Sequence, residues 1–257
     1  MHNLISHPSE LIYINNVPFV IWCYWEGDAM EGNRLLSFQY LQQHISVPIC
    51  LITPDNLNNF IKPNFPILES HQDLSIVHRS DYVRAYLMHH YGGGWHDIKA
   101  TEQSYAEVWS IFEDENIWIV GRKETAKGAA KVYTQNGDYI PNFYKDLIAV
   151  PSWVARPNTK FSEEMLEGIE AIINSNKEIL KKYPAKHPRE KKLPNTNFLK
   201  KVFNIAKFLY QKRSLHYPLD WTLFGNVFHP LILKYKGHIS YELPTDQHKN
   251  AGIYHRS

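Results

Sequence analysis

Two short apolar runs, separated by a stretch of helical character, constrain the fold of this chain more than any other feature. The runs are residues 17–22 and 48–53, and the helical stretch covers about residues 33–44. Short continuous apolar runs rich in β-branched residues are typical of strands buried on both faces of a parallel sheet. Strand, helix and strand in this order form a βαβ unit with a right-handed crossover. The beginning of the chain therefore predicts an α/β fold.

Further elements extend this prediction to a single domain. Residues 117–121 and 147–150 are expected to be strands, and a helix is expected to begin at Ser162. The chain of 257 residues contains no internal repeat and no Gly/Ser linker, so we expect one domain over residues 1–257 with a helical C-terminal elaboration. The helix after Ser162 should cover one side of the sheet with apolar residues at helical spacing. These are Met165, Leu166, Ile169, Ile172, Ile173 and Leu180.

Charge and apolar pattern argue against several classes of protein. A formal net charge of +2 is too small for non-specific nucleic-acid binding, so nucleic acid is not an expected partner. No run approaches the roughly 18 apolar residues of a membrane-spanning helix, and no signal peptide is recognisable. Cys23 and Cys50 both lie in apolar runs and indicate neither a disulfide framework nor a zinc site. These features together predict a cytoplasmic protein.

Two interpretations remain open for the basic segment at residues 199–213. A surface helix would pack its apolar face against the core of the protein. A basic amphipathic helix can instead lie on an anionic membrane, which would make the protein peripheral at the inner face of the membrane. The apolar face in question consists of Val202, Phe203, Ala206, Leu209 and Tyr210.

Residues 80–99 carry the most informative pattern in the chain. A helix is expected to begin here, with Ser80 as its cap, Asp81 at its positive N-terminal end and Gly92 as its left-handed stop. Asp81 and Arg84 are three residues apart, so they share a helix face and can present an acceptor and a forked donor to one ligand. The alternative is a surface ion pair without a role in function.

A glycine-rich turn and a short polar strand follow this helix. Gly93 and Gly94 have no side chains, so a phosphate or a sugar can approach their backbone and the turn can form a pocket wall. In the strand, residues two apart point to the same face, which places Trp95 together with Asp97 and Lys99. Asp97 and Lys99 can therefore contact one ligand. The glycines can also be merely a turn.

Together these residues resemble the motif of the capsular polysaccharide synthesis proteins and of related sugar transferases that contain a DXD motif. The pattern S-D-x-x-R, followed by Y-G-G-x-[YW]-x-D, is matched by Ser80, Asp81, Arg84, Tyr91, Gly92, Gly93 and Asp97. Two weaker similarities are an early apolar strand that ends in Trp22 and a late stretch at residues 217–230. With these, the resemblance extends over most of the chain.

The resemblance implies a GT-A type fold, a Rossmann-like α/β sheet that binds a nucleotide sugar at the carboxyl ends of its strands. Residues 15–155 would then form the donor-binding part, and residues 156–257 would form a helical part on the acceptor side. By the motif, Trp22 would stack on the nucleotide base, whereas from its apolar strand alone it can equally belong to the core. Asp81 and Arg84 would contact the ribose or the donor sugar.

Asp97 matches the first motif aspartate, which in such enzymes contacts the donor and helps to hold a divalent cation on the diphosphate. Position 99 departs from the family because it is Lys instead of the second acid. This removes an oxygen ligand that Mn²⁺ or Mg²⁺ would use. Either Lys99 itself neutralises the departing diphosphate, or another ligand completes a weaker metal site at Asp97. Asp97 and Lys99 are the candidate catalytic residues in both cases.

Two residues near the C-terminal end are further candidates. His229 can contact the diphosphate or a metal, because related folds often bring a C-terminal polar side chain over the donor, or it can be an ordinary loop histidine. Trp221 can stack on the face of a sugar or can belong to the core.

The function implied by the resemblance is transfer of a hexose-type sugar from a nucleoside diphosphate, expected to be uridine diphosphate. The acceptor would be a hydroxyl of a growing bacterial surface glycan, of the capsule or lipopolysaccharide type. The expected partners are therefore a nucleotide-sugar donor and a glycan or glycolipid acceptor. Two rival functions stay open: a nucleotide-sugar-binding protein that has lost activity, and a phosphotransferase that moves sugar phosphate.

Overall fold

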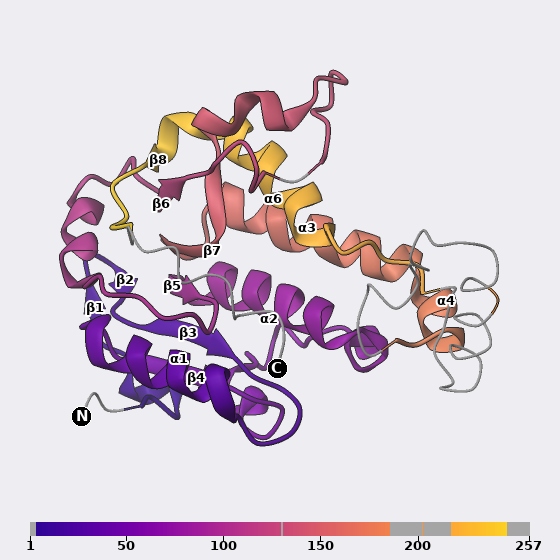
Figure 1. Ribbon diagram of the computed structural model, residues 1–257, viewed down its shortest axis with the longest axis horizontal. Helices are drawn as coiled ribbons and strands as arrows, with labels where there is room; N and C mark the ends of the chain where they lie inside the picture. The colour runs from indigo at the N-terminus through magenta and orange to yellow at the C-terminus, as the bar shows by residue number, and fades with distance from the viewer. Residues whose placement is uncertain (1–3, 130, 186–201, 203–216, 246–257) are drawn as a thin grey trace.

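A six-stranded sheet forms the centre of the structure, a computed structural model that describes residues 4–129, 131–185, 202 and 217–245 (Figure 1). In spatial order its strands are β4 (Ile49–Ile52), β3 (Ile21–Tyr24), β5 (Gly93–His96), β7 (Ile148–Ala155), β6 (Ile119–Lys123) and β8 (Ile239–Ser240). β3 is parallel to β4 and β5, and β6 is parallel to β8. β7 alone is antiparallel to its neighbours β5 and β6. The predicted Rossmann-like α/β fold with a mostly parallel sheet is confirmed.

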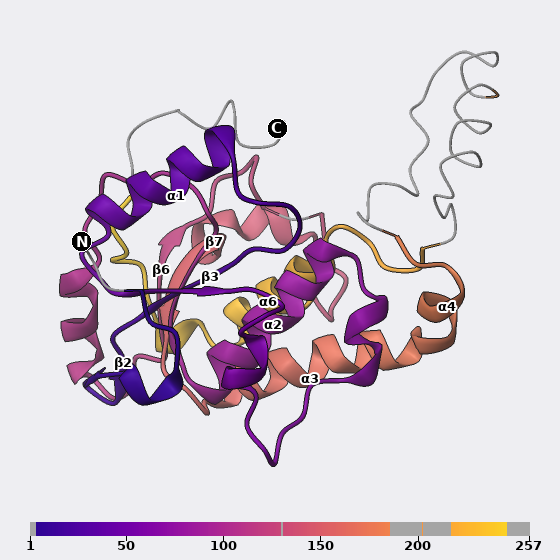
Figure 2. The ribbon, with the colours of Figure 1, turned by 90° about the horizontal axis from the view of Figure 1, so that it is seen from below.

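Helices cover both faces of this sheet (Figure 2). One face packs against α1 (Gly32–His44) and the 3-10 helix η4 (Ala106–Glu113). The other face packs against α2 (Ile76–His90), α3 (Lys160–Ser175) and α6 (Leu223–Lys234). Successive residues of a strand point to opposite faces, so Trp22 joins the core under α2 whereas its neighbours Ile21 and Cys23 join the core under α1.

The remaining elements are short. β1 (Tyr13–Ile14) and β2 (Val17–Pro18) form a separate two-stranded antiparallel sheet, so the predicted strand at residues 17–22 is divided between β2 and β3. A short helix, α4 (Lys177–Lys182), follows α3. The 3-10 turns are η1 (Pro8–Glu10), η2 (Leu57–Phe60), η3 (Glu69–Asp73), η5 (Ile140–Asp146) and η7 (Lys236–His238).

The helix that carries the motif begins earlier than the sequence pattern predicted. Its N-cap is Ser75, whose hydroxyl accepts a hydrogen bond from the backbone N–H of His78. Ser80 is therefore not a cap, and Asp81 lies in the second turn instead of at the positive helix end. The predicted stop is confirmed, because Gly92 adopts a left-handed φ of 72°. The backbone N–H of Ser75 also donates a 3.0 Å hydrogen bond to the hydroxyl of Tyr217, a contact from far along the chain that the local pattern does not reveal.

The helix expected after Ser162 is α3, which is capped by Thr159. Its residues Met165, Leu166, Ile169 and Ile173 are buried, as the spacing predicted. Leu180 is also buried but belongs to α4, because the chain leaves the helical conformation at Asn176.

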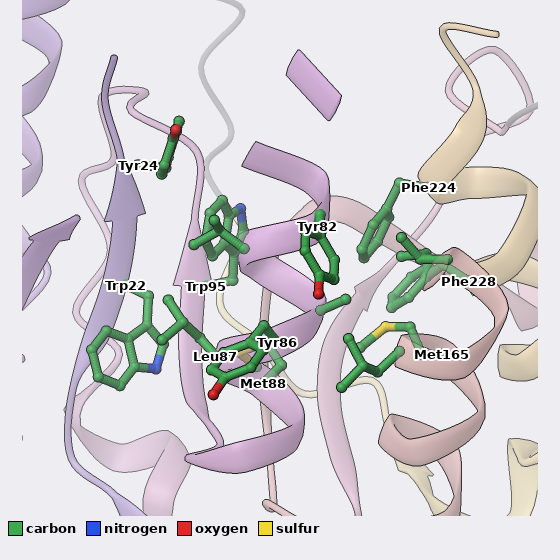
Figure 3. Close-up of a cluster of buried hydrophobic side chains, with 14 of the residues drawn as sticks. Trp22, Tyr24, Tyr82, Tyr86, Leu87, Met88, Trp95, Met165, Phe224 and Phe228 are labelled. Atoms are coloured by element: carbon green, nitrogen blue, oxygen red, sulfur yellow. The ribbon is translucent and has the colours of Figure 1, made fainter. Parts of the chain in front are cut away.

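Figure 3 shows the core that α2 shares with the sheet and with the C-terminal helices. Trp22 and Trp95 come from neighbouring strands, Tyr86 and Leu87 from α2, and Phe224 and Phe228 from α6. The basic segment at residues 199–213 lies outside the described residues, apart from Val202. Among the helices that the structure describes, none combines the length and apolar character needed to cross a membrane.

Candidate functional site

A pocket of about 940 Å³ opens at the carboxyl ends of three strands. Its wall includes Glu26 after β3, Asp97 and Lys99 after β5, and Arg122 at the end of β6. These strands point the same way, because β7 is antiparallel to both β5 and β6. The chain leaves β3 for β4 on one side and returns to β5 on the other. This is the topological switch point at which open α/β sheets bind their ligands, and the volume lies in the usual range for small-molecule sites.

An ion pair between α2 residues forms the floor of the pocket. Nη2 of Arg84 donates to Oδ1 of Asp81 at 2.9 Å, and each residue is only 5% exposed. The guanidinium carbon lies 4.7 Å from the ring centroid of Trp95 and 4.2 Å from that of Phe224, so aromatic rings fix its position. Burial raises the pKa of Asp81 to about 7, an effect that Arg84 opposes and Asp97 strengthens. The predicted shared face is confirmed, and the pair is buried rather than superficial.

Asp97 and Lys99 form a second ion pair beside the first. Nζ of Lys99 lies 3.3 Å from Oδ2 of Asp97, while Oδ1 of Asp97 accepts a hydrogen bond of 3.1 Å from Nε1 of Trp95. Nη2 of Arg84 is 4.0 Å from the same Oδ1. Burial alone would raise the pKa of Asp97, but Lys99 and Arg84 together hold it below its ordinary value. Asp97 is therefore an anion at neutral pH.

The alternation expected along this strand is also present. Trp95, Asp97 and Lys99 all line the pocket, whereas the buried ring of His96 lies near Tyr105 on the other side. Burial lowers the pKa of His96 to about 4, so its ring is neutral at pH 7.

His229 reaches the same pocket from α6 and is 1% exposed. Burial lowers its pKa to about 4, with an opposing contribution from the backbone of Ile148. Neither ring nitrogen meets the geometry of a hydrogen bond within the described residues. A buried, neutral imidazole of this kind is available to donate to, or accept from, a ligand. Trp221 lines the pocket as well and is half-buried.

The structure corrects the prediction for Trp22. Its side chain is fully buried, donates a 2.7 Å hydrogen bond from Nε1 to the carbonyl oxygen of Gly92, and packs edge-on against Phe60. An indole enclosed in this way has no face on which a nucleotide base can stack. Trp22 instead holds the turn after α2 against β3. Trp25, which directly follows β3, lines the pocket instead.

Gly93 and Gly94 also differ from the prediction, because they lie within the sheet and not in the pocket wall. A Cβ atom on Gly94 would come within 2.4 Å of the Ile21 side chain, and one on Gly93 within 3.0 Å of Val20. The missing side chains therefore make room for β3, the neighbouring strand, and not for a ligand.

Several pocket residues were not anticipated as donor contacts. Glu26 accepts a 2.6 Å hydrogen bond from the hydroxyl of Tyr24 and pairs with Arg79 at 3.0 Å. Arg122 and Glu124 come from the end of β6. Their one sequence signal is their position directly after the predicted strand at residues 117–121, since polar residues after a parallel strand can lie at the ligand edge of the sheet, but that signal needs the strand order to become specific.

The pocket presents one motif acid, Asp97, to a divalent cation, because Lys stands at position 99. Asp97 is the acid that matches the family's metal motif, and its oxygens are engaged by Lys99 and by Trp95. Mg²⁺ prefers about six oxygen ligands, and Lys supplies none. In the part of the chain that the structure describes, no group of three or more His, Cys, Asp or Glu side chains is placed to hold a metal ion.

The fold and the pocket define a Rossmann-like α/β protein with a charged ligand site at its topological switch point. The model of the family described as "Capsular polysaccharide synthesis protein" matches residues 10–139. The chain belongs to this family, which associates it with capsule biosynthesis and is compatible with a biosynthetic enzyme. The matched region contains Asp81, Arg84, Asp97 and Lys99, and His229 lies outside it. No curated protein matches the chain.

Proposed function

We propose that this protein is a glycosyltransferase that moves a sugar from a nucleoside diphosphate, most simply uridine diphosphate, to a hydroxyl of a bacterial surface glycan. The observation that carries the proposal is the pair of adjoining ion pairs in one pocket, Asp81 with Arg84 and Asp97 with Lys99. Family membership supports the biosynthetic context. The position of the pocket at the strand ends supports a nucleotide ligand.

In this proposal, carboxylates and a neutral imidazole in the pocket form different hydrogen bonds to the donor. The carboxylates of Asp81 and Asp97 accept hydrogen bonds from donor hydroxyls, and the aromatic rings around Arg84 keep that side chain in place. Two charged groups held by packing before the ligand arrives lose little entropy on binding. In the proposal, His229, which also lines the pocket, adds one neutral hydrogen bond.

The reaction breaks the bond between the anomeric carbon and the diphosphate oxygen and forms a bond to the acceptor oxygen. Positive charge builds on the sugar ring and negative charge on the departing diphosphate. The ammonium group of Lys99 stabilises that negative charge. If the anomeric configuration is retained, the acceptor hydroxyl lies on the same face as the leaving diphosphate, which takes its proton, and no separate general base is needed.

The test is a panel of nucleotide sugars, each incubated with the full chain and a glycan acceptor, in Mn²⁺ and in EDTA. Release of nucleoside diphosphate together with a lengthened acceptor would support the proposal. Saturable binding without turnover or hydrolysis would instead identify a binding protein that has lost activity. Release of nucleoside monophosphate would identify a phosphotransferase. If no nucleotide sugar binds, the proposal is wrong.

A further inference from the structure

Arg122 is a pocket residue whose charge acts on Glu124 and His96 without forming an ion pair with either. It lines the pocket from the end of β6 and is half-buried, yet it makes no hydrogen bond or ion pair with the residues that the structure describes. Taking a guanidinium partly out of water without a partner is costly, so such a group commonly serves an anionic ligand.

The sheet is irregular at Arg122, next to the pocket that this residue lines. Gly121 pairs with Trp153 and Lys123 pairs with Ile148, so the ladder between β6 and β7 is interrupted at Arg122. Such irregularities near a site typically re-aim a side chain. The next residue, Lys123, lies 5.4 Å from the ring of Tyr241 and is absent from the pocket wall.

Arg122 and Lys99 act on the same part of the pocket from two different strands. Glu124, directly after β6, has a pKa that burial raises and that both Arg122 and Lys99 lower. The pKa of His96 is lowered chiefly by burial, and again the charges of Lys99 and Arg122 both contribute. Both cations line the same pocket, Lys99 from the end of β5 and Arg122 from the end of β6, so one multiply charged anion bound there can meet both. Lys127 and Lys131 add positive charge at the exposed rim.

We propose that Arg122 and Lys99 together bind the diphosphate of the donor and that they do so without a divalent cation. This inference rests on the proposed function and assigns the chemistry of its leaving group. A guanidinium offers a planar fork to two phosphate oxygens, and an ammonium adds a compact point charge. A metal ion in this position would meet the Lys99 ammonium, which already lies 3.3 Å from the one motif acid. The two cations replace it.

The experiment measures the binding of inorganic pyrophosphate and of UDP by titration calorimetry in EDTA. Arg122→Gln should weaken the binding of both at least tenfold, as expected when a charge-assisted hydrogen bond is lost. Lys123→Gln is the matched control, because it removes the same charge one residue away on the other face of β6, and its affinities should stay within about twofold of wild type. Arg122→Lys, which keeps the charge without the fork, should fall between these variants.

Equal pyrophosphate affinity in wild type and Arg122→Gln would overturn the inference. So would wild-type UDP binding that disappears in EDTA and returns with Mn²⁺. Nucleotide-sugar turnover is measured on the same preparations. If turnover is observed, either result contradicts the inference about Arg122 and leaves the proposed function intact. Conversely, Arg122-dependent pyrophosphate binding in EDTA without turnover of any nucleotide sugar would support the anion site and contradict the glycosyltransferase proposal. Thermal unfolding of each variant verifies that the fold is retained, and Arg122→Lys decides the question if Arg122→Gln does not fold.

Discussion

Arg84 holds Asp81 at 2.9 Å one helical turn away, while its guanidinium lies between the rings of Trp95 and Phe224. The carboxylate is thus fixed by a partner that is itself fixed by packing. Breaking a buried ion pair by removing one member generally costs about 3–5 kcal/mol. The pair therefore contributes to the stability of the fold and is also a candidate binding group.

Asp97→Ala should lower sugar transfer at least a hundredfold, because it removes the anionic group that Lys99 and Trp95 both contact. The measurement is the rate of nucleoside diphosphate release with the donor identified by the panel. Asp28→Ala is the control, since Asp28 is an exposed acid outside this pocket. Near-normal turnover in Asp97→Ala would remove the basis for the site assignment.

Donor affinity should rise with pH between pH 6 and pH 8. The pKa of Asp81 is raised to about 7, so the ionised fraction grows from about one tenth to about nine tenths across this range. The ionised form is the better acceptor for a donor hydroxyl, which gives the increase its sign. A nucleotide sugar is the suitable ligand, because its diphosphate does not titrate here. Asp81→Asn should bind the nucleotide sugar at least tenfold more weakly than wild type at pH 8, and its affinity should not change with pH. If the affinity of both proteins rises equally with pH, Asp81 is not the cause.

Trp22→Phe should reduce stability without a selective loss of donor affinity. The variant loses the hydrogen bond to the carbonyl oxygen of Gly92, and leaving a buried polar group without its partner costs about 1–3 kcal/mol. Urea unfolding gives the stability, and the KM for the donor gives the affinity. A raised KM at unchanged stability would restore the stacking role that the buried position of Trp22 argues against.

Gly92→Ala should destabilise the protein more than Gly94→Ala. At Gly92 the φ of 72° is unfavourable for alanine, and the new Cβ would lie 2.7 Å from the carbonyl oxygen of Ala155. At Gly94 the clash is with the end of the Ile21 side chain, which can move. We expect more than about 2 kcal/mol for the first substitution and about 1–2 kcal/mol for the second. Equal unfolding free energies would contradict this order.

Acid should destabilise the fold through His229. Its pKa is about 4 in the folded protein, against about 6.5 in the unfolded chain. The unfolded state therefore binds the proton more readily, so this contribution is present above pH 6.5 and is lost as the pH falls toward 4. Between pH 7 and pH 5 the loss is about 2 kcal/mol. Urea unfolding at both values should show a smaller loss in His229→Asn; an unchanged loss would mean that other groups cause the acid sensitivity.

The strands and the charged pairs were predictable because each rests on local sequence spacing. The α2 face that joins Asp81 to Arg84 follows from three residues of separation, and the Asp97–Lys99 pair follows from strand alternation. The exposure of Trp22 was not predictable in this way. An apolar strand end fits both a buried indole and a stacking platform, and only the packing of Phe60 and Gly92 around it decides between them.

The direction of the strands was the second feature that could not be predicted from the sequence. An apolar run at residues 147–150 indicates a buried strand, but its antiparallel placement between β5 and β6 depends on contacts far away in the sequence. For the same reason Arg122 was not assigned to the site, since its proximity to Lys99 requires the order of the strands and not merely their positions in the chain.

The placement of β7 limits how far the protein can be truncated from its C-terminal end. The family match ends at residue 139, before β7 begins, although β7 supplies the hydrogen-bonding partner of both β5 and β6. A fragment that stopped there would retain most of the charged pocket residues, but it would lack β7 and β8, so β5 would lose one neighbouring strand and β6 both, and unpaired strand edges favour aggregation. The segment that the family model matches is therefore not expected to fold on its own, and a shortened version of the protein should include β7.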